Sequence, residues 1–463
     1  MSVFSRRQIL GSLSAGVMGL LALDRKMASA TADQGHISAP DISAKDTRGI
    51  VRIKPVFVGI TRYFPWNYPT SPSTIEELEK KTLEMIDDFK KGSDLDFIRM
   101  EKPFIINEHR DYIKLKSELT YDTDALLVGG YRVSTLDNIP LKKIGLPIIN
   151  NRVSSDFLRA LRVKKMLSES KILYIGEFPS ISVGTESTIN LFDCQESFGI
   201  RVRQIETNEF YIIFDSFKAE EVKKELSNWM KDFGEIIEPS NEHLMDMTRV
   251  YLALKALALR EDANGLAVNC NSMVIQGKRH VVPCMAFNRI IDEGIMCACE
   301  GDLGAMISAL ILNAVSGGQA VLMGNFRLRP DKDIIFIQHD IIPQTMAKTK
   351  YKLYDYHGKK WGVTGYADVK LNPMTVLNID PSYKKICVIE GNIKGSHIPE
   401  LPSGLKTCRF RVDMSVDGGS VKDIPSIMVG TNHNSMTFGH WLPALVEAGK
   451  LLNLEVNHLN NLE

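Results

Sequence analysis

Four polar residues from distant parts of the chain have side chains of the types that bind a divalent cation. Glu300 lies in the run Cys299-Glu300-Gly301-Asp302-Leu303-Gly304, and Asn325, His339 and His433 follow at increasing spacing. Carboxylate, amide and imidazole donors suit an ion such as manganese, which assists reactions of hydroxyl-rich substrates. The residue types therefore predict a metal site that widely separated segments assemble.

The sequence around each candidate also allows a structural role. Leu303–Val315 has an apolar helical pattern that stops at Gly317-Gly318, so Asp302 fits the N-cap position of a helix. Glu300 would then be a second capping acid. His339, which ends the apolar run that starts at Ile334, fits a histidine at the surface end of a strand. His433 lies in a turn-like segment and is harder to explain structurally.

Composition narrows the class of protein. The chain has 463 residues, 56 basic and 56 acidic, and 44% hydrophobic content. A neutral chain without a basic stripe is not expected to bind nucleic acid, and its length predicts two or three domains. Seven cysteines, an odd number within apolar patterns, predict buried thiols rather than a disulfide framework. No cysteine pair has the spacing of a structural zinc site.

The N-terminus has the pattern of an export signal. Ser5-Arg6-Arg7-Gln8-Ile9-Leu10 is a twin-arginine motif, and an apolar run and Ala28-Ser29-Ala30 follow it. The apolar run is too short to cross a bilayer as a helix. The pattern of residues 1–30 therefore predicts a cleaved signal sequence and a periplasmic protein. The alternative is a retained anchor that lies in the membrane interface. Residues 31–50 read as a flexible leader, and no later stretch reaches the ~18 apolar residues of a spanning helix.

Beyond the leader, strands and helices alternate and then give way to strands. The alternation of strands and helices predicts two consecutive α/β domains with parallel sheets, at residues 51–168 and 169–330. Expected helices include Ile75–Lys91, Ser155–Ser168, Lys218–Phe233 and Glu242–Leu259. Residues 331–463 predict a mostly antiparallel β domain with short strands, among them Ile334–Gln338, Thr375–Ile379, Cys408–Val416 and Ser426–Val429, and a final helix at Leu442–Leu452.

Five segments in this order resemble the L-fucose isomerase-like family, which is related to L-arabinose isomerase. They are Arg289-Ile290-Ile291-Asp292-Glu293-Gly294, Cys299-Glu300-Gly301-Asp302-Leu303, Val321–Phe326, His339 with Pro343, and Gly430-Thr431-Asn432-His433-Asn434 with Gly439-His440. The resemblance covers about residues 50–455. It implies two α/β domains, a third domain with a barrel-like portion, and homotrimers or homohexamers whose neighbouring subunits share active sites.

The resemblance also implies roles for individual residues. Glu300 falls on the first acidic ligand, which also transfers a proton, and Asn325 falls on the second acidic position. His433 falls on the C-terminal histidine ligand and His339 on the additional histidine of the arabinose branch. From the residue types alone, Arg289, Trp441 and Asp340 are further candidates for contact with the sugar, as is Trp66, and aromatic packing is the alternative for both tryptophans. Asparagine at position 325 can coordinate a metal but cannot act as a base.

These assignments predict an aldose–ketose isomerase. The reaction moves a hydrogen between adjacent carbons, a carboxylate can shuttle the proton, and a divalent cation, expected to be Mn²⁺, stabilises charge on the sugar oxygens. Two alternatives remain open: a carbohydrate-binding descendant that has lost catalysis, and another metal-assisted reaction at a sugar carbonyl such as epimerisation or aldol cleavage. The partner in each is a small sugar.

Overall fold

A computed structural model describes residues 48–59, 74–92, 95–107, 110–130, 141–177, 191–271, 273, 281–400, 404, 406–430 and 433–459. The predicted signal sequence, most of the predicted leader and Trp66 lie outside these described residues. No helix in the described ranges is long and apolar enough to cross a membrane.

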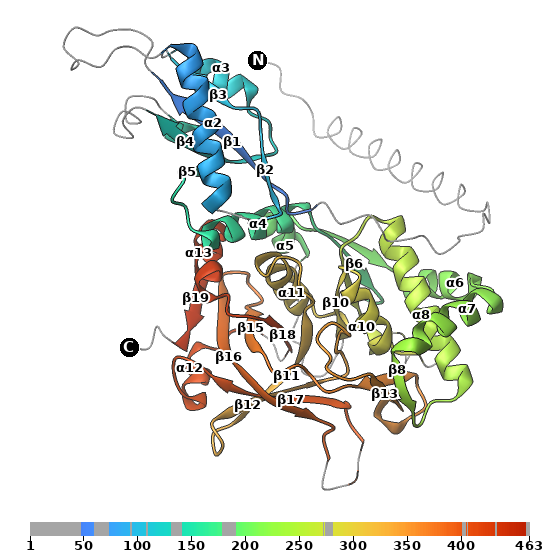
Figure 1. The fold of residues 1–463 in the computed structure, drawn as a ribbon. Helices are drawn as coiled ribbons and strands as arrows, with labels where there is room; N and C mark the ends of the chain where they lie inside the picture. Colours follow the sequence, from blue (N-terminus) through green and yellow to red (C-terminus); the bar gives the residue numbers. More distant parts are fainter. Residues whose placement is uncertain are drawn as a thin grey trace, which may run out of the picture. The chain divides into compact units, whose positions relative to one another are not determined.

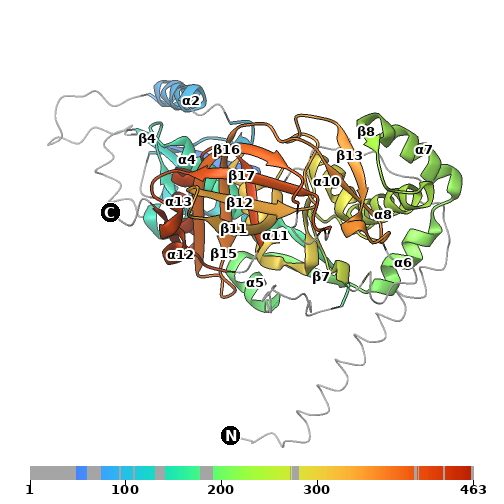
Figure 2. The same ribbon diagram turned by 90° about the horizontal axis from the view of Figure 1, so that it is seen from below.

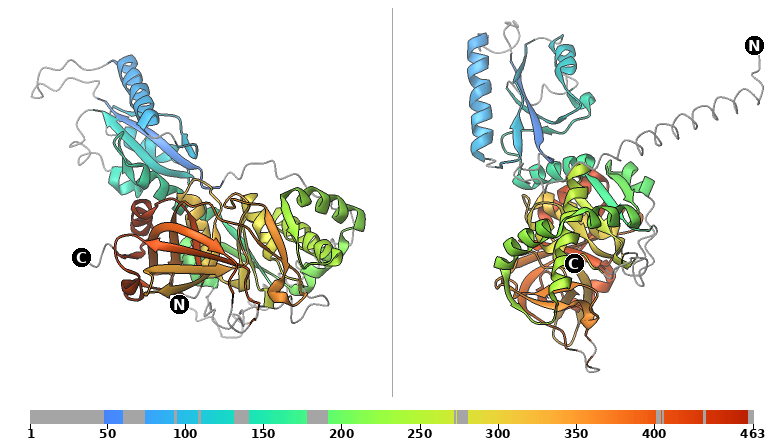
Figure 3. Two further views of the ribbon diagram at one scale, coloured as in Figure 1. Left: turned by 60° about the horizontal axis from the view of Figure 1, so that its bottom comes forward. Right: turned by 90° about the vertical axis from the view of Figure 1, so that its right-hand side faces the viewer.

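The first sheet of the described chain is parallel and has β1 (Val51–Val58) at its centre. β1 pairs with β2 (Ile98–Met100), β3 (Phe104–Ile106) and β4 (Thr123–Gly130), and β4 pairs with β5 (Ile148–Ile149). The helical segments here are α2 (Ile75–Gly92), α3 (Asp111–Glu118) and η3 (Leu141–Ile144). Figure 3 shows α2 running alongside this sheet, and the helix buries Leu78, Ile86 and Phe89 at helical spacing.

A second parallel sheet has the strand order β10-β9-β6-β7. Its strands are β6 (Lys171–Ile175), β7 (Arg201–Ile205), β9 (Gly265–Val268) and β10 (Met296–Ala298). The helices of this region are α4 (Ser155–Glu169), α5 (Leu191–Phe198), α6 (Thr207–Ser216), α7 (Ala219–Trp229), α8 (Asn241–Arg260), α10 (Cys284–Asp292) and α11 (Leu303–Val315), with the short turn η4 (Met230–Asp232) after α7. The expected pair of parallel α/β sheets is confirmed.

Helix α11 is buried along its whole length. It packs against β9 and β10 of the second sheet and also against β15 (Pro373–Ile379) and β18 (His433–Phe438) (Figure 1). A helix that is apolar on every face belongs in such a position between two layers. The turn η5 (Cys299–Gly301) joins β10 to α11, so the backbone of Glu300 is held between two buried elements.

The C-terminal region contains a closed antiparallel barrel, as the sequence predicted. Its six strands follow the order β15, β18, β11, β12, β17 and β16, and β16 pairs again with β15 (Figure 2). The remaining bounds are β11 (Leu322–Arg329), β12 (Ile334–His339), β16 (Lys385–His397) and β17 (Phe410–Val416). β19 (Glu455–His458) adds a parallel strand to β16, and α13 (Leu442–Leu452) matches the predicted final helix.

Alternation along β12 explains how a histidine comes to be buried at the end of the barrel. Ile335, Ile337 and His339 are buried, whereas the residues between them are only partly buried. His339 lies opposite the buried Phe410 of β17. Because side chains two apart on a strand share a face, His339 is the last member of an otherwise apolar row.

A smaller sheet links regions that the sequence had assigned to different domains. β8 (Phe233–Ile236) pairs in parallel with β13 (Tyr351–Asp355), which pairs with β14 (Val363–Tyr366). The domain boundary expected at residue 330 stays a prediction, and this pairing crosses it. The turn η6 (Tyr356–Gly358) follows β13.

Two local predictions were wrong. Ser426–Val429, expected as a strand, overlaps the short helix α12 (Ile424–Ile427), because Ser420 and Asp423 form a capping box at η7 (Val421–Asp423) and start a helical path. The long helix expected at Lys218–Phe233 ends at Trp229, and Phe233 already begins β8.

Candidate metal centre

Three of the four predicted metal ligands converge in the structure. One donor atom from each of Glu300, His339 and His433 lies within 4.8 Å of the other two. The imidazole rings of His339 and His433 have centroids 5.4 Å apart, and Nε2 of His433 lies 3.9 Å from a carboxylate oxygen of Glu300. These residues come from the turn after β10, the end of β12 and the start of β18, so the barrel and the second sheet meet at this cluster.

Glu300 stands on a strained turn. Its φ is +57° and that of Gly301 is +67°. The strain is of the order of 1–2 kcal/mol for a residue other than glycine. A Cβ at Gly301 would lie 2.5 Å from the Tyr174 hydroxyl, so the turn requires glycine there. Such outliers persist where the surrounding structure fixes them, often at functional sites. The Glu300 side chain is 27% exposed, whereas His433 is 1% exposed.

Asp302 connects the start of α11 to His433. One of its oxygens accepts the backbone N–H of Ala305 at 2.9 Å, which confirms the predicted N-cap. The other oxygen lies 3.0 Å from Nδ1 of His433. A carboxylate that holds one ring nitrogen leaves the other nitrogen free to face a metal ion.

Each histidine of the cluster has one ring nitrogen that is buried without a hydrogen-bond partner among the described residues. These atoms are Nε2 of His433, which lies 3.9 Å from Glu300, and Nδ1 of His339. Buried polar atoms are nearly always satisfied, so two such atoms beside a carboxylate need an explanation. A divalent cation would satisfy them, because two imidazoles and a carboxylate form a suitable ligand set. The residues present therefore fit the metal that the sequence implied.

Electrostatics give the two histidines different protonation behaviour. Burial, reinforced by the neighbouring His433, lowers the pKa of His339 to about 4, so this imidazole is neutral near pH 7. Burial also opposes charge on His433, but the hydrogen bond that its ring N–H donates to Asp302 and the charges of Asp302 and Glu300 outweigh burial and raise the pKa of His433. A cation at the cluster would therefore compete with a proton on His433.

Asn325 lies on the strand next to His433. The two residues are opposite each other in the antiparallel pairing of β11 with β18. Met323, two residues earlier and on the same face of β11, accepts the backbone N–H of Cys299 through its sulfur at 3.1 Å. That face of β11 thus borders the turn that carries Glu300. Ligation by the Asn325 carboxamide stays a prediction.

The three residues predicted to contact sugar have other partners in this chain. Arg289 pairs with Glu225 at 2.6 Å, and its guanidinium lies over the Tyr251 ring. Trp441 donates its indole N–H to the Phe438 carbonyl at 2.8 Å. Asp340 is 1% exposed and accepts the Thr364 hydroxyl and the Arg409 backbone N–H. Contact of these three residues with sugar stays a prediction.

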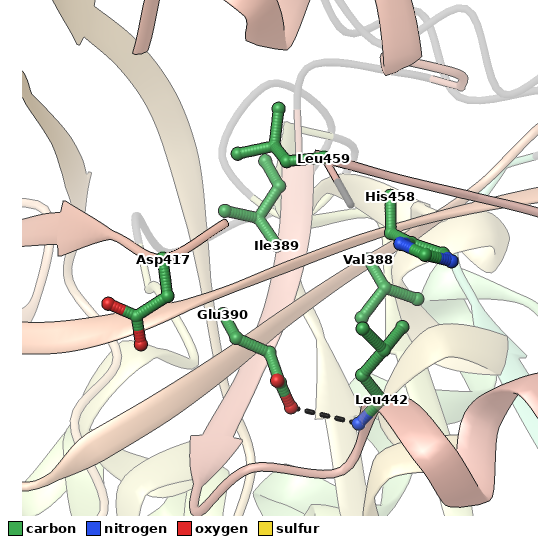
Figure 4. A pocket seen from close by; sticks show the side chains of 7 residues that line it. All are labelled: Val388, Ile389, Glu390, Asp417, Leu442, His458 and Leu459. Carbon is green, nitrogen blue, oxygen red and sulfur yellow. Dashed lines mark hydrogen bonds between the residues drawn. The ribbon is translucent and has the colours of Figure 1, made fainter. Parts of the chain in front are cut away.

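A small hollow elsewhere on the barrel does not compete with this cluster. It is lined by Val388, Ile389, Glu390, Asp417, Leu442, His458 and Leu459 (Figure 4). Glu390 is its most buried acid, but its carboxylate already accepts the Leu442 N–H at 2.8 Å and the Thr375 hydroxyl at 3.2 Å. A carboxylate engaged in this way has a structural role.

No protein family model matches the chain. Two curated relatives do match it, and both are named sulfoquinovose isomerase, one from Priestia aryabhattai and one from Priestia megaterium. This chain is similar to sulfoquinovose isomerases. Each is 20% identical to it over 313 residues, which are 64% of this chain and 66% of the relative. The match therefore spans just under two thirds of the relatives' own length.

Proposed function

We propose that the protein is a metal-dependent aldose–ketose isomerase whose divalent ion, Mn²⁺, is held by Glu300, His339 and His433. The observation that carries this proposal is the buried, unpartnered Nε2 of His433, which faces Glu300 while Asp302 holds Nδ1. The similarity to sulfoquinovose isomerases supports the class of reaction.

Each residue of the cluster has a distinct task in this proposal. Glu300 is the partly exposed member, so its carboxylate reaches the bound sugar and carries the proton between two adjacent carbons. His339 and His433 are buried and present fixed nitrogen donors. Asp302 keeps the His433 ring in one orientation. When bound, the cation stabilises negative charge that develops on neighbouring sugar oxygens.

The substrate class in this proposal is an aldose or its ketose. The relatives are named for sulfoquinovose, a sulfonated sugar, so that compound belongs in the test panel beside unsulfonated aldoses. We also propose that the protein is exported by the twin-arginine route to the periplasm and forms a homotrimer or homohexamer with shared active sites. Sedimentation of the purified protein tests the oligomer, and a monomer at assay concentration contradicts it.

One observation favours the alternative of a sugar-binding protein without isomerase activity. Asn325 provides a neutral oxygen where the resemblance implies a carboxylate, and an amide cannot take part in proton transfer. Loss of one acidic group would weaken metal binding and leave Glu300 as the single carboxylate of the cluster among the described residues.

Exchange of solvent hydrogen into sugars tests the proposal. The protein with saturating Mn²⁺ is expected to incorporate deuterium from solvent into at least one sugar of the panel and to convert it between aldose and ketose. Glu300→Gln keeps the shape and an oxygen donor but removes the base, so exchange is expected to fall by the ~10²–10⁴-fold typical of general acid–base catalysis.

The control for this experiment is Glu84→Gln, an exposed carboxylate on α2 that is not part of the cluster. Exchange by this variant should equal that of the unmodified protein. Bound manganese is measured in every sample, so that loss of the ion is separated from loss of the base. Sugar binding without exchange into any panel member would contradict the isomerase and support the binding protein.

A further inference from the structure

A second set of metal-binding side chains lies in the structure and shares no residue with the first. Asp340 follows β12, His357 lies in η6, and Cys408 lies just before β17. One donor atom from each lies within 4.8 Å of the other two. Nε2 of His357 is 3.4 Å from a carboxylate oxygen of Asp340 and 3.4 Å from the Cys408 sulfur.

The geometry of this set differs from that of a nucleophile relay. In a relay the histidine uses one ring nitrogen for the acid and the other for the nucleophile. Here the same nitrogen of His357 faces both Asp340 and Cys408. The three donor atoms therefore converge on one point, as the ligands of a metal ion do.

The two oxygens of the Asp340 carboxylate have different surroundings. Oδ1 accepts the Thr364 hydroxyl and the Arg409 backbone N–H, each at 2.7 Å. Oδ2 is buried in a residue that is 1% exposed; it faces Nε2 of His357 at 3.4 Å but makes no hydrogen bond of normal geometry among the described residues. Outer contacts that fix one oxygen of a carboxylate while the other faces a further donor are typical of metal ligands.

The guanidinium of Arg409, whose backbone N–H binds Asp340, does not neutralise this buried acid. Arg409 places its backbone N–H on Asp340, but its guanidinium binds Glu238 at 3.0 Å and lies over the Tyr354 ring. Buried charges are usually paired or bound to a metal, and within the described part of the chain the Asp340 carboxylate has an ion-pair contact with His357 alone. A cation shared by Asp340, His357 and Cys408 would compensate the carboxylate fully.

We propose that Asp340, His357 and Cys408 form a second metal site, of the zinc type. Thiolate, imidazole and carboxylate are the three ligand types that zinc takes in proteins, and three protein ligands leave its fourth position open to water or a small ligand. The thiolate separates this site from the oxygen and nitrogen cluster at Glu300, which suits manganese. Because the site shares no ligand with that cluster, the proposal does not depend on isomerase activity.

Cobalt is the probe that distinguishes the two sites, because a Co²⁺ ion bound to a thiolate gives a sulfur-to-metal charge-transfer absorption that oxygen and nitrogen ligands do not give. The full chain, stripped of metal and titrated with Co²⁺, is expected to show this absorption and to lose it on addition of Zn²⁺. Cys408→Ala should abolish the band. Cys387→Ala, which removes another buried thiol on β16, should leave it intact.

A second variant separates loss of a metal ligand from loss of the fold. His357 has a φ of +48°, and asparagine tolerates this left-handed backbone, so His357→Asn removes the ligand while the turn is kept. Its zinc affinity should fall by more than the ~10–100-fold that loss of a second-shell partner costs. Glu300→Gln should keep the charge-transfer band. Absence of the band in the unmodified protein, its survival in Cys408→Ala, or its loss in Glu300→Gln would each overturn a separate zinc-type site.

Discussion

The Asp302 carboxylate binds the first turn of α11 through one oxygen and the His433 ring through the other, at 3.0 Å. Asp302, which the sequence predicts as a helix N-cap, therefore also orients His433, a proposed metal ligand. The stability of the start of α11 and the orientation of the His433 ring depend on the same side chain.

Replacing Asp302 separates these two effects. Asp302→Asn keeps an oxygen that can cap the helix but loses the negative charge beside His433, so manganese affinity should fall by ~10–100-fold. Its free energy of unfolding should change little, because asparagine caps about as well as aspartate. Asp302→Ala should lose manganese affinity as well, and its free energy of unfolding should fall by ~0.5–2 kcal/mol because the helix cap is missing. Manganese titration and urea unfolding measure the two quantities, and unchanged affinity in Asp302→Asn would contradict the support role.

Asn325→Asp is expected to tighten manganese binding. The substitution adds a carboxylate on the strand that pairs with His433, and a charged oxygen binds a hard cation more strongly than an amide oxygen does. The matched control is Asn151→Asp, which adds the same charge at an exposed position. If titration shows equal or weaker binding in Asn325→Asp than in the control, Asn325 is not a ligand.

Acid sensitivity without metal should come partly from His339. Its folded pKa of about 4 lies below the ordinary value of 6.5, so between these pH values the unfolded chain binds a proton that the folded chain does not. Stability from this group is present above pH 6.5 and is lost as the pH falls towards 4, by at most roughly 3 kcal/mol. His433, whose pKa is raised, has the opposite sign, because its contribution is present below 6.5 and is lost as the pH rises through the folded pKa.

His339→Phe tests this in chelator-treated protein. The variant keeps an aromatic ring in a buried position and removes the titrating group, so unfolding free energy should depend less on pH between 6.5 and 4. His397→Gln, which removes an exposed histidine, should retain the full dependence. Equal slopes for His339→Phe and the unmodified protein would show that His339 does not titrate in this way.

Two substitutions at Glu300 should separate backbone strain from metal binding. Glu300→Gly and Glu300→Ala both remove the carboxylate, but only glycine adopts a φ of +57° without strain. Manganese binding should be lost in both. Without metal, the glycine variant should be more stable than the alanine variant by about 1 kcal/mol. Calorimetry of both proteins measures the difference, and an alanine variant of equal or greater stability would argue against strain at this turn.

The export proposal has its own test at the N-terminus. Replacing Arg6-Arg7 with Lys-Lys should leave full-length precursor inside the cell, because the twin-arginine translocase recognises that pair. Cell fractionation with an antibody to the mature protein measures this outcome. If the double variant were cleaved and exported normally, residues 1–30 would not be a twin-arginine signal.

Residues with strong local signals were predictable from the sequence. Leu303–Val315 has the same bounds in the structure as in the sequence pattern, because its apolar run starts at a capping acid and stops before two glycines. The convergence of Glu300 with two histidines followed from the family resemblance rather than from spacing. The contact of Asp302 with His433 joins residues 131 positions apart, and no local pattern records it.

Other features left no signal or an ambiguous one. His357 and Cys408 lie 51 positions apart, which matches no zinc motif, and only the folds of η6 and β17 bring them to Asp340. The short apolar run at Ser426–Val429 fits a strand and a buried helical turn equally well by periodicity. The capping residues upstream, Ser420 and Asp423, decide for the helix.

Closure of the barrel has a consequence for how the candidate metal centre can open. β12 and β18, which carry the two histidines, each pair with a strand on both sides, so neither can fray away as an edge strand. Glu300 lies on a turn outside that ring. The Glu300 side chain, which is 27% exposed, can therefore change rotamer without any opening of the backbone, whereas the two buried imidazoles are held by strands that are paired on both sides. The proposed proton-transfer group can thus adjust to a sugar while the two nitrogen donors keep their positions.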